Sequence, residues 1–294
     1  MAAPYFFLAS GYLLAVKMSW PYADNPDNAN RLLKQTKRII KMYLLWTLIY
    51  FPLAVYNFIS SGTSPIDAVL SYLRGFLFVG ENYNSWQLWY LLSTIYTLLI
   101  LYIIIFKIKK SSSVTLILMS VIASIIMFGV SALAAYEGEM PALLHIAQKL
   151  VSCTCINGRI FSGMIYIPVG MLLAKKQIPF IVNLILFILG FISNLFISYS
   201  IVSNYLMIIT AIALFGIIKK IELKNRVVYP ILRNMSTTVY LIHMYIWTFY
   251  YTIAYGEKTS GLDSFLVTSI ISVLFFFIVG FVKKYLKNKK NLKT

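Results

Sequence analysis

Four cationic side chains recur at helical spacing near the start of the chain. Arg31, Lys34, Arg38 and Lys41 are separated by three, four and three residues, so a helix would place them on one face. The stripe would extend over about 15 Å at a rise of 1.5 Å per residue. An apolar and aromatic segment follows it directly. Such a stripe can anchor a membrane helix at lipid phosphates, and it can equally bind the phosphate groups of a ligand.

Histidine is the second residue type with suitable chemistry, and the chain has 2 histidines. His243 falls within an apolar segment, and an ionisable side chain in lipid is a functional candidate by default. The alternative is a neutral imidazole that is hydrogen-bonded to a neighbouring helix. His145 falls in a long connecting segment, residues 134–158, where a solvated side chain is the simpler interpretation.

The composition is that of an integral membrane protein. Of the 294 residues, 60% are hydrophobic and 12% are charged, whereas a soluble domain carries about 25% charged residues. The net charge of +17 is spread over short segments between apolar runs, which argues against a nucleic-acid-binding domain. Cys153 and Cys155 are too close in sequence for a favourable disulfide and too few for a metal site, so we expect structural cysteines and no metal.

We expect an all-α integral membrane protein with a single transmembrane domain over residues 1–294 and no separate soluble domain. Nine apolar segments are expected to form membrane helices, near residues 2–16, 39–59, 86–106, 113–133, 159–174, 178–198, 204–218, 235–256 and 263–282. If the segments alternate across the bilayer, all but four of the 26 Lys and Arg residues fall on one side. The exceptions are Arg74, Lys149, Arg159 and Lys258. This asymmetry predicts a cytoplasmic C-terminus and an N-terminus outside.

Four further residues are candidates for a structural or a binding role. Ser10 and Gly11 are most simply a small-residue contact that lets two helices approach closely. Trp89 fits either an aromatic belt at the outer membrane surface or a pocket for an acceptor molecule. Arg159, at the outer end of a helix, fits either lipid headgroup contact or the orientation of a polar or acidic acceptor. The sequence contains no phosphate-binding glycine loop, nucleophile elbow or zinc motif.

Five segments, in order along the chain, resemble the acyltransferase 3 family of membrane acyltransferases. They are PYFFLASGYLLA (Pro4 to Ala15), TKRIIKMYLLW (Thr36 to Trp46), WQLWYLLSTIY (Trp86 to Tyr96), NGRIFSGMIYIPVGMLLAKK (Asn157 to Lys176) and STTVYLIHMYIW (Ser236 to Trp247). The resemblance extends over almost the whole chain.

The resemblance implies a bacterial plasma-membrane enzyme. It would move an acyl group from cytoplasmic acyl-CoA, with acetyl-CoA the expected donor, to a hydroxyl of an envelope glycan or similar acceptor at the outer face. Arg31, Lys34, Arg38 and Lys41 would hold the phosphates of the acyl-CoA, and Ser10 and Gly11 would line its path. Trp89 and Arg159 would contact the acceptor. The expected partners are the bilayer and a hydroxyl-bearing acceptor, and not nucleic acid.

The sequence departs from the family pattern at two places. The family has arginine at both basic positions, where this chain has Arg38 and Lys41, which keeps the charge but loses one bidentate donor. The family's first helix, with its essential histidine, has no counterpart here, so we expect a tenth helix before Met1 and no acyl transfer by residues 1–294 alone. His243 is the remaining candidate base, and we expect it to be structural and bonded across to another helix.

Two other functional classes remain open. The first is a non-enzymatic relative, either a polysaccharide exporter or a substrate-binding membrane module attached to another enzyme. The second is a truncated, inactive copy.

Overall fold

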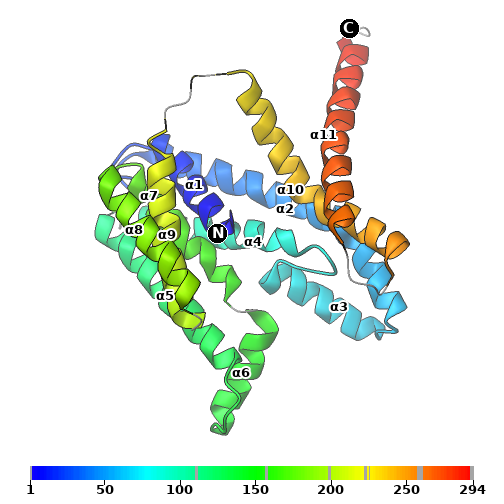
Figure 1. Cartoon of the computed structure of the whole chain (residues 1–294), viewed down its shortest axis with the longest axis horizontal. Helices are drawn as coiled ribbons and strands as arrows, with labels where there is room; N and C mark the ends of the chain where they lie inside the picture. Colours follow the sequence, from blue (N-terminus) through cyan, green and yellow to red (C-terminus); the bar gives the residue numbers. More distant parts are fainter. Residues whose placement is uncertain are drawn as a thin grey trace. The chain divides into compact units, whose positions relative to one another are not determined.

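The computed structural model describes residues 2–109, 112–155, 158–197, 200–221, 224, 226–256 and 261–291. Within these ranges the regular structure is entirely helical and includes eleven α-helices (Figure 1). The helices up to residue 134 are α1 (Ala2–Val16), α2 (Pro26–Ser60), α3 (Pro65–Arg74), α4 (Trp89–Tyr102) and α5 (Ser113–Ala134). The later ones are α6 (Ala142–Thr154), α7 (Ser162–Leu173), α8 (Phe180–Phe196), α9 (Ser200–Ile218), α10 (Val228–Ala254) and α11 (Leu262–Asn291).

Short helices of other types extend two of these elements and precede others. They are the π-helices η1 (Gly75–Val79) and η3 (Ile103–Lys107) and the 3₁₀-helices η2 (Trp86–Leu88) and η4 (Arg159–Phe161). Each of the nine expected apolar segments overlaps one of the α-helices, which confirms the all-helical class.

Four helical stretches in the described residues are long and apolar enough to cross a membrane. They are Pro26–Ser60, Trp86–Lys107, Ser113–Ala134 and Leu262–Val282. A fifth span results if Ala142–Thr154 and Arg159–Leu173, which are bent by 65°, count as one broken span. Helices α1, α8 and part of α9 are apolar but shorter. The chain is therefore a helical membrane protein, although fewer helices pass this test than the nine that the sequence predicted.

The connecting segment 134–158 contains a helix that the sequence analysis missed. Helix α6 buries none of its residues and places Leu143, Leu144 and Leu150 on one exposed apolar side. Helix α3 is similar, with Ile66 and Leu70 exposed on its apolar side. Both helices have the amphipathic pattern typical of segments that lie in a membrane surface. They were missed because their apolar residues are spaced at helical period and never form a long apolar run.

The chain forms two compact units, each described here by itself. Unit 1 consists of Met1–Leu45, Val69–Gly80 and Trp89–Glu222. Within it α7 packs along α1, α5 and α4, and α8 packs along α9. The most buried side chains of this unit include Phe7, Leu8, Ile165, Ile167 and Met171, all within 1% exposure, from α1 and α7. The α1–α7 pair is therefore the core of unit 1.

Unit 2 consists of Trp46–Ala68, Glu81–Leu88 and Leu223–Thr294. Its main contact is between α10 and α11, and η2 packs against α10. Helix α10 is longer than predicted, since it begins at Val228 rather than near residue 235. Its buried residues are Leu241, Ile242, Met244 and Thr248, which surround position 243.

Candidate functional site

The basic stripe occupies the exposed side of the first half of α2, in unit 1. Its four members, Arg31, Lys34, Arg38 and Lys41, are all exposed, as the helical spacing predicted. The opposite side of the helix is buried and consists of Asn28, Leu32, Thr36, Ile39 and Tyr43. Among the described residues, none of the four cations forms an ion pair or hydrogen bond. The stripe therefore presents uncompensated positive charge to an external anion.

A buried asparagine holds the beginning of this helix in place. Asn28 is 0% exposed, and its Nδ2 donates to the carbonyl oxygens of Ser19 at 2.8 Å and Tyr22 at 3.0 Å. Its Oδ1 accepts from the Ser19 amide at 3.1 Å. The Tyr22 hydroxyl in turn donates to the Met171 carbonyl of α7 at 3.0 Å. These contacts fix the direction in which the stripe leaves the α1–α7 core. The sequence analysis missed both residues, although a polar Asn28 one turn before the stripe was a visible signal.

Ser10 and Gly11 lie where α1 crosses the rest of unit 1. A Cβ atom added to Gly11 would lie 2.1 Å from the carbonyl oxygen of Ile167, and one added to Gly170 would lie 2.2 Å from that of Leu8. Only glycine allows this approach of the two backbones, so Gly11 faces α7 and serves close packing. The Ser10 hydroxyl lies 2.8 Å from the Tyr90 hydroxyl of α4, and the pair shares a hydrogen bond.

An aromatic cluster surrounds that hydrogen bond. The Phe7 ring centroid lies 4.4 Å from that of Tyr90, 5.8 Å from that of Trp89 and 6.5 Å from that of Tyr166. The Arg159 guanidinium lies 5.7 Å from the centroid of the Trp89 ring, which is within the range of a cation–π contact. Trp89, Tyr90 and Arg159 are each only half-buried, so the cluster has an accessible side.

Three of the residues predicted from the sequence thus converge in one place. Ser10, Trp89 and Arg159 come from α1, α4 and η4 and are linked through Phe7 and Tyr90. The cations of the basic stripe form no hydrogen bond or ring contact with this cluster in the described residues. Unit 1 therefore carries two separate groups of candidate binding residues, one cationic and one aromatic.

His243 lies in unit 2, and among the described residues it bonds only within α10, so the expectation of a bond to another helix was wrong. Its Nδ1 lies 2.7 Å from the Tyr240 carbonyl and 3.2 Å from the Val239 carbonyl, both in the preceding turn of α10. Because carbonyls only accept, Nδ1 carries the proton. In the neutral ring Nε2 then has a free lone pair. The half-buried imidazole therefore has the tautomer that a general base requires at Nε2.

The turn of α10 that carries His243 is opened by a tyrosine from α2. The Tyr50 hydroxyl donates to the Leu241 carbonyl at 3.0 Å and accepts from the Tyr245 amide at 3.0 Å. An uninterrupted helix would pair that carbonyl and that amide with each other. The Gln87 amide nitrogen also donates to the Leu241 carbonyl, at 3.0 Å. The hydroxyl is thus inserted into the hydrogen-bond ladder across position 243, a recognised cause of helix bending.

Gln87 is the second residue of this network that sequence reasoning overlooked. It is 3% exposed, and its backbone carbonyl accepts from the Tyr240 hydroxyl at 2.9 Å. Its Oε1 has no hydrogen-bond partner among the described residues. A buried amide in an apolar segment was the available signal, because such a group must find partners or leave an unsatisfied polar atom.

His145 lies on the exposed surface of α6 rather than in an irregular loop. No group of three or more His, Cys, Asp or Glu side chains within the described ranges could hold a metal ion. Cys153 and Cys155 are both free thiols. Among the described residues, no cluster of potential metal ligands includes His145.

A stretch of 123 residues is 34% identical to a protein called amino-acid racemase from Enterococcus faecalis. The match extends over 40% of this chain and 16% of that protein, so the chain spans only a small part of this relative's length. No solved structure matches the chain significantly. An acyltransferase domain family matches residues 1–284, which include unit 1 and most of unit 2. The chain therefore belongs to the acyltransferase 3 family of membrane proteins.

Proposed function

We propose that the protein moves an acyl group from acyl-CoA, with acetyl-CoA the preferred donor, to a hydroxyl group of an envelope glycan or similar acceptor. Membership of the acyltransferase 3 family supports the reaction class. The basic stripe is the observation that supports acyl-CoA as the donor. Its four exposed cations share one side of α2, and none has an anionic partner among the described residues. Coenzyme A carries several phosphate groups, which such a stripe can bind by charge-assisted hydrogen bonds.

The sequence favoured a structural His243 and an inactive chain. We propose His243 instead as the base for the acceptor hydroxyl, because its hydrogen bonds lie within α10 and involve Nδ1 rather than Nε2. Its Nδ1–H is held by the Tyr240 carbonyl, which leaves Nε2 to take the proton of the hydroxyl. The hydroxyl oxygen then forms a bond to the acyl carbon, and the carbon–sulfur bond of the thioester breaks. The coenzyme A thiolate leaves and takes up the proton that the imidazole accepted, which returns His243 to its neutral form. No metal takes part in this scheme.

Considered within unit 1 alone, the aromatic cluster is the surface that we propose for recognition of the acceptor. Trp89 offers a flat apolar face of the kind on which sugar rings stack, and Arg159 beside it offers charged N–H donors at 5.7 Å from the ring centroid. Ser10 belongs to the same cluster through Tyr90. In this interpretation Gly11 contributes indirectly, by keeping α1 close to α7.

We further propose nine membrane crossings in a bacterial plasma membrane, with the N-terminal end of this chain outside and its C-terminal end inside. The charge asymmetry supports this orientation, because all but four of the 26 Lys and Arg residues would be cytoplasmic. The shorter apolar helices would cross as packed pairs, as α1 packs with α7 and α8 with α9. The family match over residues 1–284 supports treating both units as parts of one domain.

The donor assignment can be tested by acetyl-CoA binding to the purified full chain. Arg38→Ala should weaken binding by about ten- to hundred-fold, because a hydrogen bond between charged groups contributes about 1.5–3 kcal/mol. Lys107→Ala is the control, because Lys107 is also exposed but lies outside α2. Equal affinities of the two variants would reduce the stripe to a membrane anchor.

A second candidate is a substrate-binding membrane module without transferase activity. The similarity to the amino-acid racemase of Enterococcus faecalis favours this alternative. The name of that protein indicates an enzyme that acts on amino acids, and part of its sequence is similar to part of this chain. On this alternative the chain would bind a free amino acid and would not consume acetyl-CoA. Acyl transfer from labelled acetyl-CoA in membranes containing the chain would exclude the alternative, and saturable binding of an amino acid without acyl transfer would favour it.

A further inference from the structure

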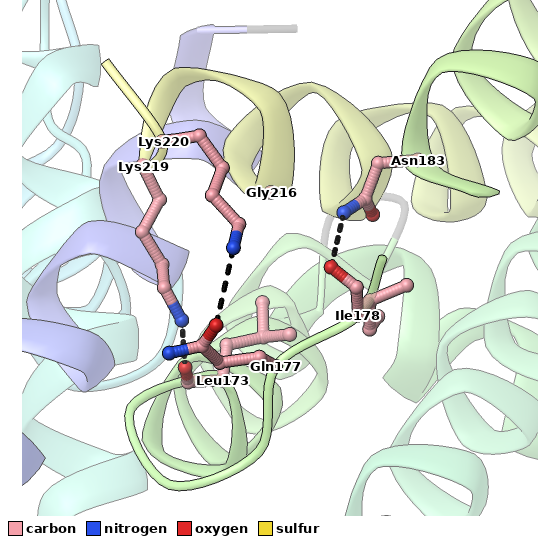
Figure 2. Close-up of a pocket in the computed structure, with 7 residues that line it drawn as sticks. All are labelled: Leu173, Gln177, Ile178, Asn183, Gly216, Lys219 and Lys220. Atoms are coloured by element: carbon pink, nitrogen blue, oxygen red, sulfur yellow. Dashed lines mark hydrogen bonds between the residues drawn. The ribbon is translucent and has the colours of Figure 1, made fainter. Parts of the chain in front are cut away.

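A small pocket lies where α7 and α9 end in unit 1. Figure 2 shows the two lysine side chains that follow α9 reaching toward the end of α7. The residues that line the pocket are Leu173, Gln177, Ile178, Asn183, Gly216, Lys219 and Lys220. Its polar groups are thus two ammonium groups and two amides.

The two lysines bring neighbouring positive charges to one place. Lys219 Nζ donates to the Leu173 carbonyl and lies 5.2 Å from the centroid of the Tyr12 ring. Lys220 Nζ donates to Gln177 Oε1 at 3.1 Å. Burial, and then the charge of Lys220, hold the pKa of Lys219 below its usual range. Each ammonium has three N–H donors and uses one in these side-chain hydrogen bonds, so both can donate to a further group.

A buried asparagine forms the inner wall. Asn183 is 1% exposed, and its Nδ2 donates to the Ile178 carbonyl at 3.3 Å. Its Oδ1 has no partner among the described residues, so a buried acceptor is left unsatisfied. Gly216 makes room for this amide, since an added Cβ would lie 2.6 Å from its Cγ, Nδ2 and Oδ1. The pocket therefore has an unsatisfied acceptor beside its two cations.

Helix capping accounts for only part of this arrangement. A lysine near the last carbonyls of a helix is stabilised by them, which explains the contact between Lys219 and Leu173. It does not explain why the Lys220 side chain also extends toward the end of α7, at Gln177, nor why the Asn183 oxygen is left unpaired. Within the described residues, neither lysine pairs with a carboxylate. An anion between the ammonium groups would compensate both charges.

We propose that this pocket binds a phosphate ester that carries a hydroxyl or N–H donor near its phosphate. The phosphate would lie against Lys219 and Lys220, and the donor would reach Asn183 Oδ1. Two sources share this chemistry: the headgroup of an anionic phospholipid such as phosphatidylglycerol, and coenzyme A. The site is separate from the stripe on α2, and it does not require acyl transfer to occur.

The test measures binding to the purified full chain in nanodiscs of phosphatidylcholine. The probes are acetyl-CoA, titrated by calorimetry, and phosphatidylglycerol, whose binding is measured by native mass spectrometry. Lys220→Gln removes one exposed charge, so folding is retained, and Lys219→Gln with Lys220→Gln removes both. Lys176→Gln is the control, because Lys176 is exposed near the end of α7 but does not line the pocket.

For at least one probe, Lys220→Gln should weaken binding about ten-fold and the double variant further, whereas the control should stay within two-fold. Loss for acetyl-CoA alone identifies the donor as the ligand, loss for phosphatidylglycerol alone identifies the lipid, and loss for both indicates a general phosphate-ester site. Unchanged binding of both probes in Lys220→Gln overturns the proposal. Arg38 is intact in all these variants. Whether the basic stripe binds acetyl-CoA is therefore tested separately, by Arg38→Ala.

Discussion

Replacing Tyr50 with phenylalanine removes a single oxygen atom from the turn of α10 that contains His243. The side chain is 2% exposed, and its hydroxyl bridges the Leu241 carbonyl and the Tyr245 amide at 3.0 Å each. Phenylalanine keeps the ring, so the change creates almost no cavity. The effect therefore comes from hydrogen bonding alone.

The expected loss follows from which groups keep a partner. The Leu241 carbonyl still accepts from Gln87 at 3.0 Å, so it remains satisfied. The Tyr245 amide loses its acceptor unless α10 closes and pairs it with the Leu241 carbonyl. A buried donor left unpaired costs about 1–3 kcal/mol, and closure of the helix would recover part of this. We therefore expect Tyr50→Phe to lower the free energy of unfolding by about 1–2 kcal/mol.

The assay is reversible unfolding of the purified chain in mixed micelles, followed by circular dichroism. Tyr56→Phe is the matched control, since Tyr56 lies on the same helix, is 57% exposed and has no hydrogen bond among the described residues. Its effect should stay within about 0.5 kcal/mol. If the two variants are equally stable, the inserted hydroxyl does not hold the turn, and the reasoning about α10 is refuted.

Three further predictions concern packing, topology and catalysis. Gly11→Ala should destabilise the protein by about 1–3 kcal/mol because the added Cβ meets a backbone oxygen. Gly129→Ala should be tolerated, because no atom lies within 4 Å of the added Cβ, and thermal unfolding compares the two variants. In a variant without native cysteines, Ser61→Cys should react with an impermeant maleimide in whole cells and Lys109→Cys should not; the reverse pattern would invert the orientation. His243→Ala should abolish acyl transfer while acetyl-CoA affinity stays within two-fold, and full activity of the variant would remove His243 as the base.

The sequence was most informative where apolar residues form long runs. The run at 113–133 became α5, and the run at 263–282 became the apolar part of α11, because apolar length alone determines such helices in lipid. The exposed side of α2 also followed directly from the spacing of its cations. In contrast, α6 has no long apolar run, and its amphipathic pattern was hidden in a segment interpreted as a loop.

The candidate residues could be named from the sequence, but their contacts could not. Trp89 and Arg159 were each singled out from their place near the outer ends of helices, yet the cation–π contact between them depends on how α4 and η4 meet. For His243, the sequence-based prediction was wrong about its hydrogen-bond partner. The ring bonds to its own helix because carbonyls three and four residues back are always within reach, whereas a partner on another helix requires a specific packing.

The length of a hydroxyl-bearing side chain affects whether its hydrogen-bond partner lies in its own helix or in another segment. Short side chains such as Thr94 and Thr248 donate to carbonyls four residues back, which the sequence position alone predicts. Tyrosines extend beyond their own helix: Tyr43 donates to the Phe76 carbonyl at 2.6 Å, and Tyr96 donates to the Leu77 carbonyl at 2.6 Å.

Ser93 has a short side chain, yet its hydroxyl bonds to another segment of the chain. It donates to the Ile160 carbonyl at 2.7 Å and accepts from the Gly163 amide at 2.9 Å. An added Cβ at Gly163 would lie 2.9 Å from the Ser93 carbonyl oxygen, so the glycine is what brings the two backbones within range. The long-range contact of Ser93 therefore depends on a glycine opposite its short hydroxyl. The glycine condition can be recognised in a sequence only after the two facing helices are known.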